Sequence, residues 1–135
     1  MPLRHTASVS RTGPAEPVLL GGYAAKQCPV RTHNDFTPLV PVPEWVPSAE
    51  LQALFDAGRQ FEAEVFAELV RIHRDTAELI DPDLRKPAAI AKTLVAMESG
   101  APLVLGGWLP DDNAGGRKGR PDVLVKVGGG YLPAD

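Results

Sequence analysis

The sequence predicts an α/β domain in which a mixed sheet is flanked by helices, and three observations predict this class. One long segment, residues 49–73, carries apolar residues at three- and four-residue steps, the spacing of one helix face. A second helical segment, 87–99, lies between two strand-like runs. Two more strand-like runs, 123–127 and 130–133, follow each other directly, which favours a mixed or antiparallel arrangement over a wholly parallel sheet.

The first third of the chain contains little regular pattern. Residues 1–17 mix proline, serine, threonine and charge without either period, which predicts a disordered leader. Residues 18–20, followed by two glycines, predict a short strand that ends in a turn. We expect one short helix over 23–34, broken or restarted at Cys28-Pro29 because proline lacks a backbone donor. Four prolines in residues 38–47 predict an extended connector.

The long helix has a clear start. Ser48 is a good N-cap, and Glu50 places negative charge in the first turn, where it complements the helix dipole. The helix is predicted to run to about His73, with an interruption at 56–58 as an alternative. Its apolar stripe consists of Leu51, Leu54, Phe55, Gly58, Phe61, Val65 and Leu69.

The second half of the chain supplies the sheet. A short strand is predicted at 76–80, and then the helix 87–99, which ends at Gly100. A strand-like run at 102–108 follows, and a glycine turn at 128–130 joins the last two strands. The predicted inward residues of the helix are Ile90, Leu94 and Met97.

Bulk properties limit the function classes. The formal net charge of −3 predicts no general attraction to nucleic acid, so nucleic-acid binding would need a local basic patch. Arg117, Lys118 and Arg120, at the end of a polar, glycine-rich loop over 111–119, are the candidates for such a patch; an ordinary solvated loop is the alternative. No glycine-rich phosphate loop of Walker or Rossmann spacing is present.

The compartment is predicted to be the cytoplasm. The chain of 135 residues fits one domain, and its single cysteine, Cys28, excludes an internal disulfide and suits a reducing compartment. One cysteine and three scattered histidines do not make a zinc site. No apolar run reaches the roughly 18 to 20 residues that cross a bilayer, and no secretory signal is evident, so no membrane association is expected.

Glu62 is the first candidate functional residue. At about 100° per residue it falls within the apolar stripe beside Gly58, Val65 and Leu69, whereas Glu64 points away from it. Burying an unpartnered carboxylate costs several kcal/mol or more. Glu62 therefore either pairs with a cation or hydrogen-bond donors, or faces a cleft; a glutamate that reaches water from the edge of the stripe is the structural alternative.

Asp122 and Asp135 are the other candidates. Asp122 precedes an apolar strand and shares one face with Leu124 and Lys126, although an aspartate after proline is also common turn chemistry. Asp135 alternates onto one face of the next strand, or else is simply a solvated terminal acid. Two carboxylates on adjacent strands are suited to a hard divalent cation.

The joint pattern points to one family. It combines G-x-x-x-E on the long helix (Gly58 and Glu62), Gly119-Arg120-Pro121-Asp122 opening a strand, and the acid Asp135 on the next strand. In this the sequence resembles the RecB-like PD-(D/E)XK nucleases, bacterial proteins often linked to helicases. The resemblance covers about residues 19–135. It implies a restriction-endonuclease-like core, C-terminally incomplete, of which residues 18–135 form the N-terminal part.

The resemblance implies a role for each acid. Glu62 would assist the metal site, Asp122 would bind the metal, and Asp135 would be the acid of the (D/E)-x-K motif and a second ligand, with Mg²⁺ or Mn²⁺ as cofactor. The lysine of that motif is expected two positions after Asp135, past the last residue, so we expect a truncated form. Lys126, on the face of Asp122, is the alternative to this lysine.

Cys28 carries a second part of the resemblance. Some RecB-like nucleases hold an iron–sulfur cluster with one N-terminal and three C-terminal cysteines, and Cys28 lies where the first ligand would be. A small buried thiol is the alternative, since the other three ligands are absent from this sequence. Four aromatic residues are candidates either for base stacking or for the core: Tyr23, Trp45, Trp108 and Tyr131.

Together with these acids, the resemblance implies a metal-dependent nuclease that hydrolyses phosphodiester bonds in DNA, with a helicase domain or subunit as a possible partner. One alternative is a catalytically inactive, nuclease-like module that binds nucleic acid or protein. Another is a small domain whose carboxylates are all structural.

Overall fold

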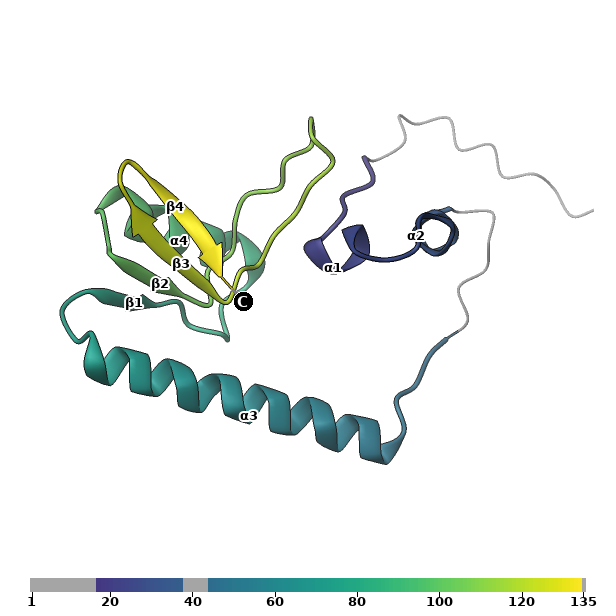
Figure 1. Ribbon diagram of the computed structural model, residues 1–135, viewed down its shortest axis with the longest axis horizontal. Coiled ribbons are helices and arrows are strands. Elements are labelled where there is room, and N and C mark those ends of the chain that lie inside the picture. Colours follow the sequence, from purple (N-terminus) through teal and green to yellow (C-terminus); the bar gives the residue numbers. More distant parts are fainter. Residues whose placement is uncertain (1–16, 38–43, 135) are drawn as a thin grey trace, which may run out of the picture.

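The computed structural model describes residues 17–37 and 44–134, so the leader predicted at 1–17 lies, except for its last residue, outside the described residues. A four-stranded sheet carries α4 (Lys86–Glu98) on one side, and α3 (Ala49–Ile72) runs below the sheet (Figure 1). Two short helices, α1 (Gly22–Ala25) and α2 (Pro29–Phe36), lie beyond the loop that precedes the third strand. The predicted α/β class, a mixed sheet flanked by helices, is confirmed.

The four strands follow one another across the sheet in chain order. They are β1 (Ala77–Leu79), β2 (Leu103–Leu105), β3 (Val123–Val127) and β4 (Gly130–Ala134). β1 and β2 are parallel and connected through α4, whereas β3 is antiparallel to both β2 and β4. Gly128 has a φ of +59°, which the tight turn between β3 and β4 requires and which glycine adopts without strain.

α3 is one continuous helix, without the interruption considered at 56–58. Its N-cap is the predicted one, because the hydroxyl of Ser48 accepts a hydrogen bond of 3.3 Å from the N–H of Leu51. The apolar stripe is not part of the core: no residue of α3 is buried, and Leu54 and Phe61 are 65% and 68% exposed. Figure 1 shows that the N-terminal half of α3 extends beyond the sheet, which leaves residues such as Leu54 without a partner element in the described part of the chain.

The core lies between the sheet and α4, and the predicted inward face of α4 was only partly right, because Met97 packs against the core but is not buried. Leu94 is exposed, and Ile90 and Met97 are only partly buried. A Cβ at Gly107 would lie 3.1 Å from Cγ2 of Thr93, so the backbone approaches α4 too closely for large side chains. The buried residues of α4 are accordingly small: Ala89, Thr93 and Ala96.

The strand predicted at 18–20 is reduced to a single bridge between Leu20 and Arg117. The N–H of Leu20 donates to the carbonyl of Gly116 at 2.8 Å, and its carbonyl accepts from the N–H of Lys118 at 3.1 Å. These two hydrogen bonds hold Leu20 against the loop ahead of β3.

The region predicted as one helix over 23–34 forms two, because the chain leaves helical geometry at Cys28, before Pro29 restarts it. Of the connector predicted at 38–47, residues 44–47 are neither helix nor strand, and 38–43 lie outside the described part of the chain.

Candidate functional site

A pocket of about 390 Å³ lies between α3 and one end of the sheet. Its walls are mostly apolar, but Glu62 on α3 and Arg120 from the loop ahead of β3 both line it. Glu62 therefore borders a cleft. The full set of lining residues is Arg59, Glu62, Ala63, Phe66, Ala67, Leu79, Ile80, Pro82, Gly106 and Arg120.

Glu62 is half-buried although most of α3 is exposed. Among the residues that the structure describes, it has no ion-pair partner, since the nearby Arg59 pairs with Asp56. Glu64, by contrast, is exposed and accepts a hydrogen bond of 3.0 Å from Gln60. A half-buried carboxylate without a partner creates a place where binding a cation is favourable.

Asp122 reaches the edge of the same pocket through its backbone. Its carbonyl accepts a 2.8 Å hydrogen bond from the N–H of Gly106, which lines the pocket together with Glu62. Gly106 has a φ of +65°, and a Cβ there would lie 3.5 Å from the ring of Phe66 on α3. The side chain of Asp122 is exposed, one residue ahead of β3. Gly106 is thus where α3 and the segment of Asp122 meet.

Asp135 lies outside the described residues. The last pair in the register of β3 and β4 is Val123 with Ala134, the neighbours of Asp122 and Asp135 in the sequence. Within residues 17–37 and 44–134, no three histidine, cysteine, aspartate or glutamate side chains are grouped so as to hold a metal ion. A metal site here therefore needs Asp135, or other groups outside the described residues, besides Glu62 and Asp122.

Asp112 holds the polar loop ahead of β3 in shape. Its carboxylate accepts the N–H of Gly115 at 2.8 Å and pairs with the guanidinium of Arg117 at 2.8 Å. These contacts, with the Gly115 N–H the largest cause, lower the pKa of Asp112. Arg117 is therefore neutralised within the loop, whereas Lys118 and Arg120 form no ion pair with any described residue.

Arg120 is the functional candidate whose position the sequence did not reveal. The sequence predicted it in a basic patch and in the G-R-x-D motif, and the structure shows that it also lines the pocket of Glu62. Its Cζ lies 5.1 Å from the centre of the Trp108 ring, a distance typical of a cation–π contact. The available signal was its place two residues ahead of Asp122 in the G-R-x-D motif.

The aromatic residues divide between the core and the surface. Tyr131 packs against the core, and its hydroxyl donates a 2.7 Å hydrogen bond to the carbonyl of Ala101. Trp108 also contacts the core, although it is half-buried. Tyr23 is 81% exposed, and Trp45 contacts the exposed Phe55 edge-on.

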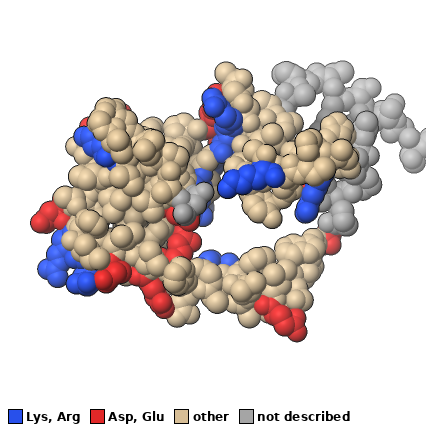
Figure 2. Space-filling model, viewed as in Figure 1, with Lys and Arg blue, Asp and Glu red and all other residues tan. Residues whose placement is uncertain are grey.

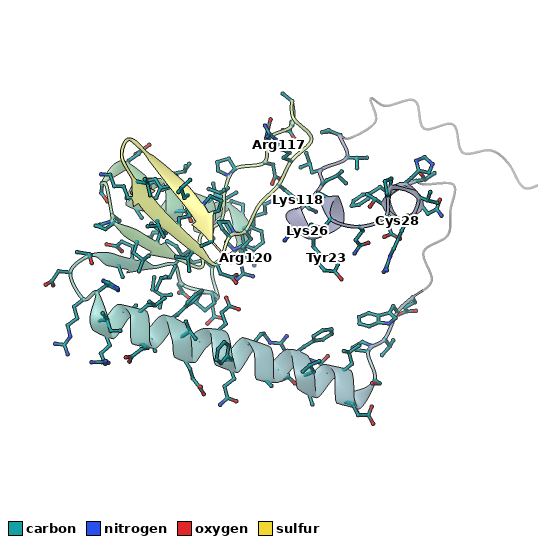
Figure 3. The ribbon with its side chains drawn as sticks, in the orientation of Figure 1. Tyr23, Lys26, Cys28, Arg117, Lys118 and Arg120 are labelled. Atoms are coloured by element: carbon teal, nitrogen blue, oxygen red, sulfur yellow. The ribbon has the colours of Figure 1, made fainter. Side chains whose placement is uncertain are left out.

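Cys28 is exposed at the N-cap of α2, not buried (Figure 3). The N–H groups of Arg31 and, to a smaller extent, Val30 lower the pKa of its thiol by favouring the thiolate. The sequence has no second cysteine, so an iron–sulfur cluster would need ligands from elsewhere. The iron–sulfur role of Cys28 stays a prediction.

No family model, curated protein or solved structure matches this chain. Within the described ranges, no helix combines the length and the apolar character needed to cross a membrane. The chemistry of the site is therefore the basis for a functional assignment.

Proposed function

We propose that this chain is part of a metal-dependent nuclease that hydrolyses phosphodiester bonds in DNA, on a RecB-like, restriction-endonuclease-like core. The observation that supports this most is the placement of Glu62. Its carboxylate is half-buried and has no ion-pair partner among the described residues, in a pocket that Arg120 also lines. The backbone of Asp122 is hydrogen-bonded to Gly106 in the wall of that pocket.

The donor chemistry fits a hard cation. Glu62, Asp122 and Asp135 would offer only carboxylate oxygens, the ligands that Mg²⁺ and Mn²⁺ prefer. When bound, such an ion activates water and stabilises negative charge at phosphorus. The guanidinium of Arg120 would bind a phosphate oxygen and orient the strand. The proposal requires the next pair in the β3–β4 register to consist of Asp122 and Asp135.

Isothermal titration of the full chain with Mn²⁺ tests this proposal. We expect Mn²⁺ to bind, and Asp122→Asn to weaken binding by at least about tenfold, a loss that even outer-shell partners of a metal cause. Asp75→Asn, the same substitution at an exposed position in the turn after α3, is the matched control. An unchanged Mn²⁺ affinity in Asp122→Asn, or no Mn²⁺ binding by the unaltered chain, would contradict the metal site.

A second candidate is a nuclease-like module that binds nucleic acid without cleaving it. The observation that favours it is the pair Lys118 and Arg120, which line a pocket with Trp108 and have no ion-pair partner among the described residues. Binding of an oligonucleotide by a chain that does not bind Mn²⁺ would select this candidate. The helicase partner, the cytoplasmic location and the iron–sulfur role of Cys28 follow from the family resemblance and are part of this proposal.

A further inference from the structure

A second pocket, of about 320 Å³, lies between the start of α1 and the loop ahead of β3. Three of its eight lining residues are cations and one is an acid, and the other four are three glycines and a tryptophan. The lining residues are Gly21, Gly22, Lys86, Trp108, Asp111, Lys118, Gly119 and Arg120. Its size matches that of small-molecule pockets, which begin at about 300 Å³.

The charge of this pocket is positive. Lys86 is neutralised by Asp111, whose two carboxylate oxygens lie 2.8 and 2.7 Å from its Nζ. Lys118 and Arg120 are left without an ion-pair partner in the described part of the chain. Figure 2 shows Lys and Arg side chains over the loop and over α1 and α2, whereas many Asp and Glu side chains lie along α3. An anion is therefore the ligand that this pocket favours, although the whole chain is acidic.

Aromatic surface accompanies the positive charge. The ring of Trp108 lines the pocket, with Nζ of Lys86 5.8 Å from its centre. Tyr23 directly follows the lining residue Gly22 and is 81% exposed. Figure 3 shows Tyr23 and Lys26 extending from α1 on the side that faces α3. Cations beside exposed aromatic rings are the combination by which proteins bind single-stranded nucleic acid, with phosphates on the cations and bases on the rings.

The pocket is preorganised by backbone hydrogen bonds. The N–H of Lys118 donates to the carbonyl of Leu20 at 3.1 Å, which fixes the loop against the residue that precedes Gly21. A Cβ at Gly21 would lie 4.0 Å from Cε of Lys118, so these two residues form adjoining parts of the wall. Because the wall is already ordered, ligand binding would cost the protein little conformational entropy.

Arg120 lines both this pocket and the pocket of Glu62. We propose that the pocket around Trp108 and Lys118 is a subsite for one nucleotide of a single-stranded polynucleotide. Lys118 and Arg120 bind its phosphates, its base stacks on Trp108, and the strand continues past Arg120 toward Glu62. The charge and the aromatic rings of the pocket support the subsite by themselves, and only the direction of the strand rests on the proposed nuclease function.

Fluorescence anisotropy of a labelled oligothymidylate, with EDTA present to remove metal, measures this binding on the full chain. We expect Lys118→Gln to weaken binding by about tenfold or more, the loss of one charge-assisted contact, and to reduce the salt dependence by about one ion. Arg117→Gln is the matched control, because it removes the same charge from the adjacent residue but from a side chain that is paired with Asp112. We expect Arg117→Gln to leave the affinity unchanged.

Tryptophan fluorescence tests the stacking separately. The sequence contains two tryptophans, so Trp45→Phe leaves Trp108 as the only tryptophan. We expect oligothymidylate to quench the fluorescence of this variant, and an unquenched signal at saturating oligothymidylate overturns the stacking.

Three results of the binding experiment overturn the subsite. Equal losses in Lys118→Gln and Arg117→Gln would indicate general charge attraction. Equal affinity for duplex DNA would remove the preference for a single strand. If a phosphoserine peptide displaces the labelled oligothymidylate as well as unlabelled oligothymidylate does, the ligand of this pocket is a phosphoprotein and not a polynucleotide.

The two proposals fail in different experiments. If the chain binds Mn²⁺ but not oligothymidylate, only the subsite is refuted. If it binds oligothymidylate but not Mn²⁺, only the nuclease proposal is refuted.

Discussion

The backbone N–H of Trp108 donates a 3.0 Å hydrogen bond to the hydroxyl of Thr93 on α4. That hydroxyl in turn donates to the carbonyl of Ala89 at 2.8 Å, and Thr93 is completely buried. A single side chain thus connects the helix that covers the sheet to the residue whose ring lines the basic pocket. The position of the ring therefore depends on the packing of α4.

Thr93→Val should destabilise the fold, because it keeps the shape of the side chain but leaves the partly buried N–H of Trp108 without its acceptor. The expected loss is about 1 to 3 kcal/mol in the free energy of unfolding, measured by urea denaturation. Thr93→Ser keeps the hydroxyl and should lose less. Equal stability of Thr93→Val and the unaltered chain would show that this hydrogen bond does not contribute.

Glu62→Gln should reduce the increase in melting temperature that Mn²⁺ produces, because metal that binds only the folded state stabilises it. Glu64→Gln makes the same substitution two residues later, at an exposed side chain, and should preserve the increase. Circular dichroism melts of both variants with and without Mn²⁺ provide the comparison. An equal response of the two variants would remove Glu62 from the metal site.

Asp112 should titrate below the usual range of aspartate, since its pKa is lowered in the fold. A carboxylate with a lowered folded pKa stabilises the loop at pH values above its unfolded pKa, and this contribution is lost as the pH falls through the folded pKa. The amide NMR shift of Gly115, the hydrogen-bond donor to Asp112, should follow this titration. Asp112→Asn should abolish the transition; a midpoint at the ordinary aspartate pKa would contradict the contacts in the loop.

Cys28 should react as a thiolate at lower pH than an ordinary cysteine, because the N–H groups of Arg31 and Val30 lower the pKa of its thiol. The rate of alkylation by iodoacetamide should rise with pH, with a midpoint below that of the same chain unfolded in urea. Cys28 is the only cysteine, so the rate reports this residue alone. Identical midpoints in the folded and unfolded chains would show that α2 does not perturb the thiol.

Local features of the fold were predictable from the sequence. The N-cap at Ser48 and the turn at Gly128 depend on residues within one or two turns of backbone, so their chemistry can be read directly. Periodicity also singled out Glu62 as a carboxylate inside an apolar stripe. Glu62 lines a pocket, in agreement with the expectation that it faces a cleft, although the stripe itself stays mostly exposed.

The buried residues of α4 could not be predicted, because periodicity favours large apolar residues, of which Met97 packs against the core but Leu94 is exposed. The close approach of Gly107 to Thr93 instead selects small residues, and that approach is a property of the packed sheet. The pairing of Leu20 with the loop of Arg117 was likewise invisible in the sequence, since the two segments are far apart along the chain.

The sequence alone determined the class of the fold, the order of most of its helices and strands, and the acids worth testing, because these depend on composition, caps and periodicity. Only the tertiary structure brought Arg120 into the wall of both pockets and left Lys118 without an ion-pair partner among the described residues while Arg117 was neutralised. The physical reason is that a pocket and its charge balance arise from long-range packing, in which neighbouring residues of one loop can acquire opposite surroundings.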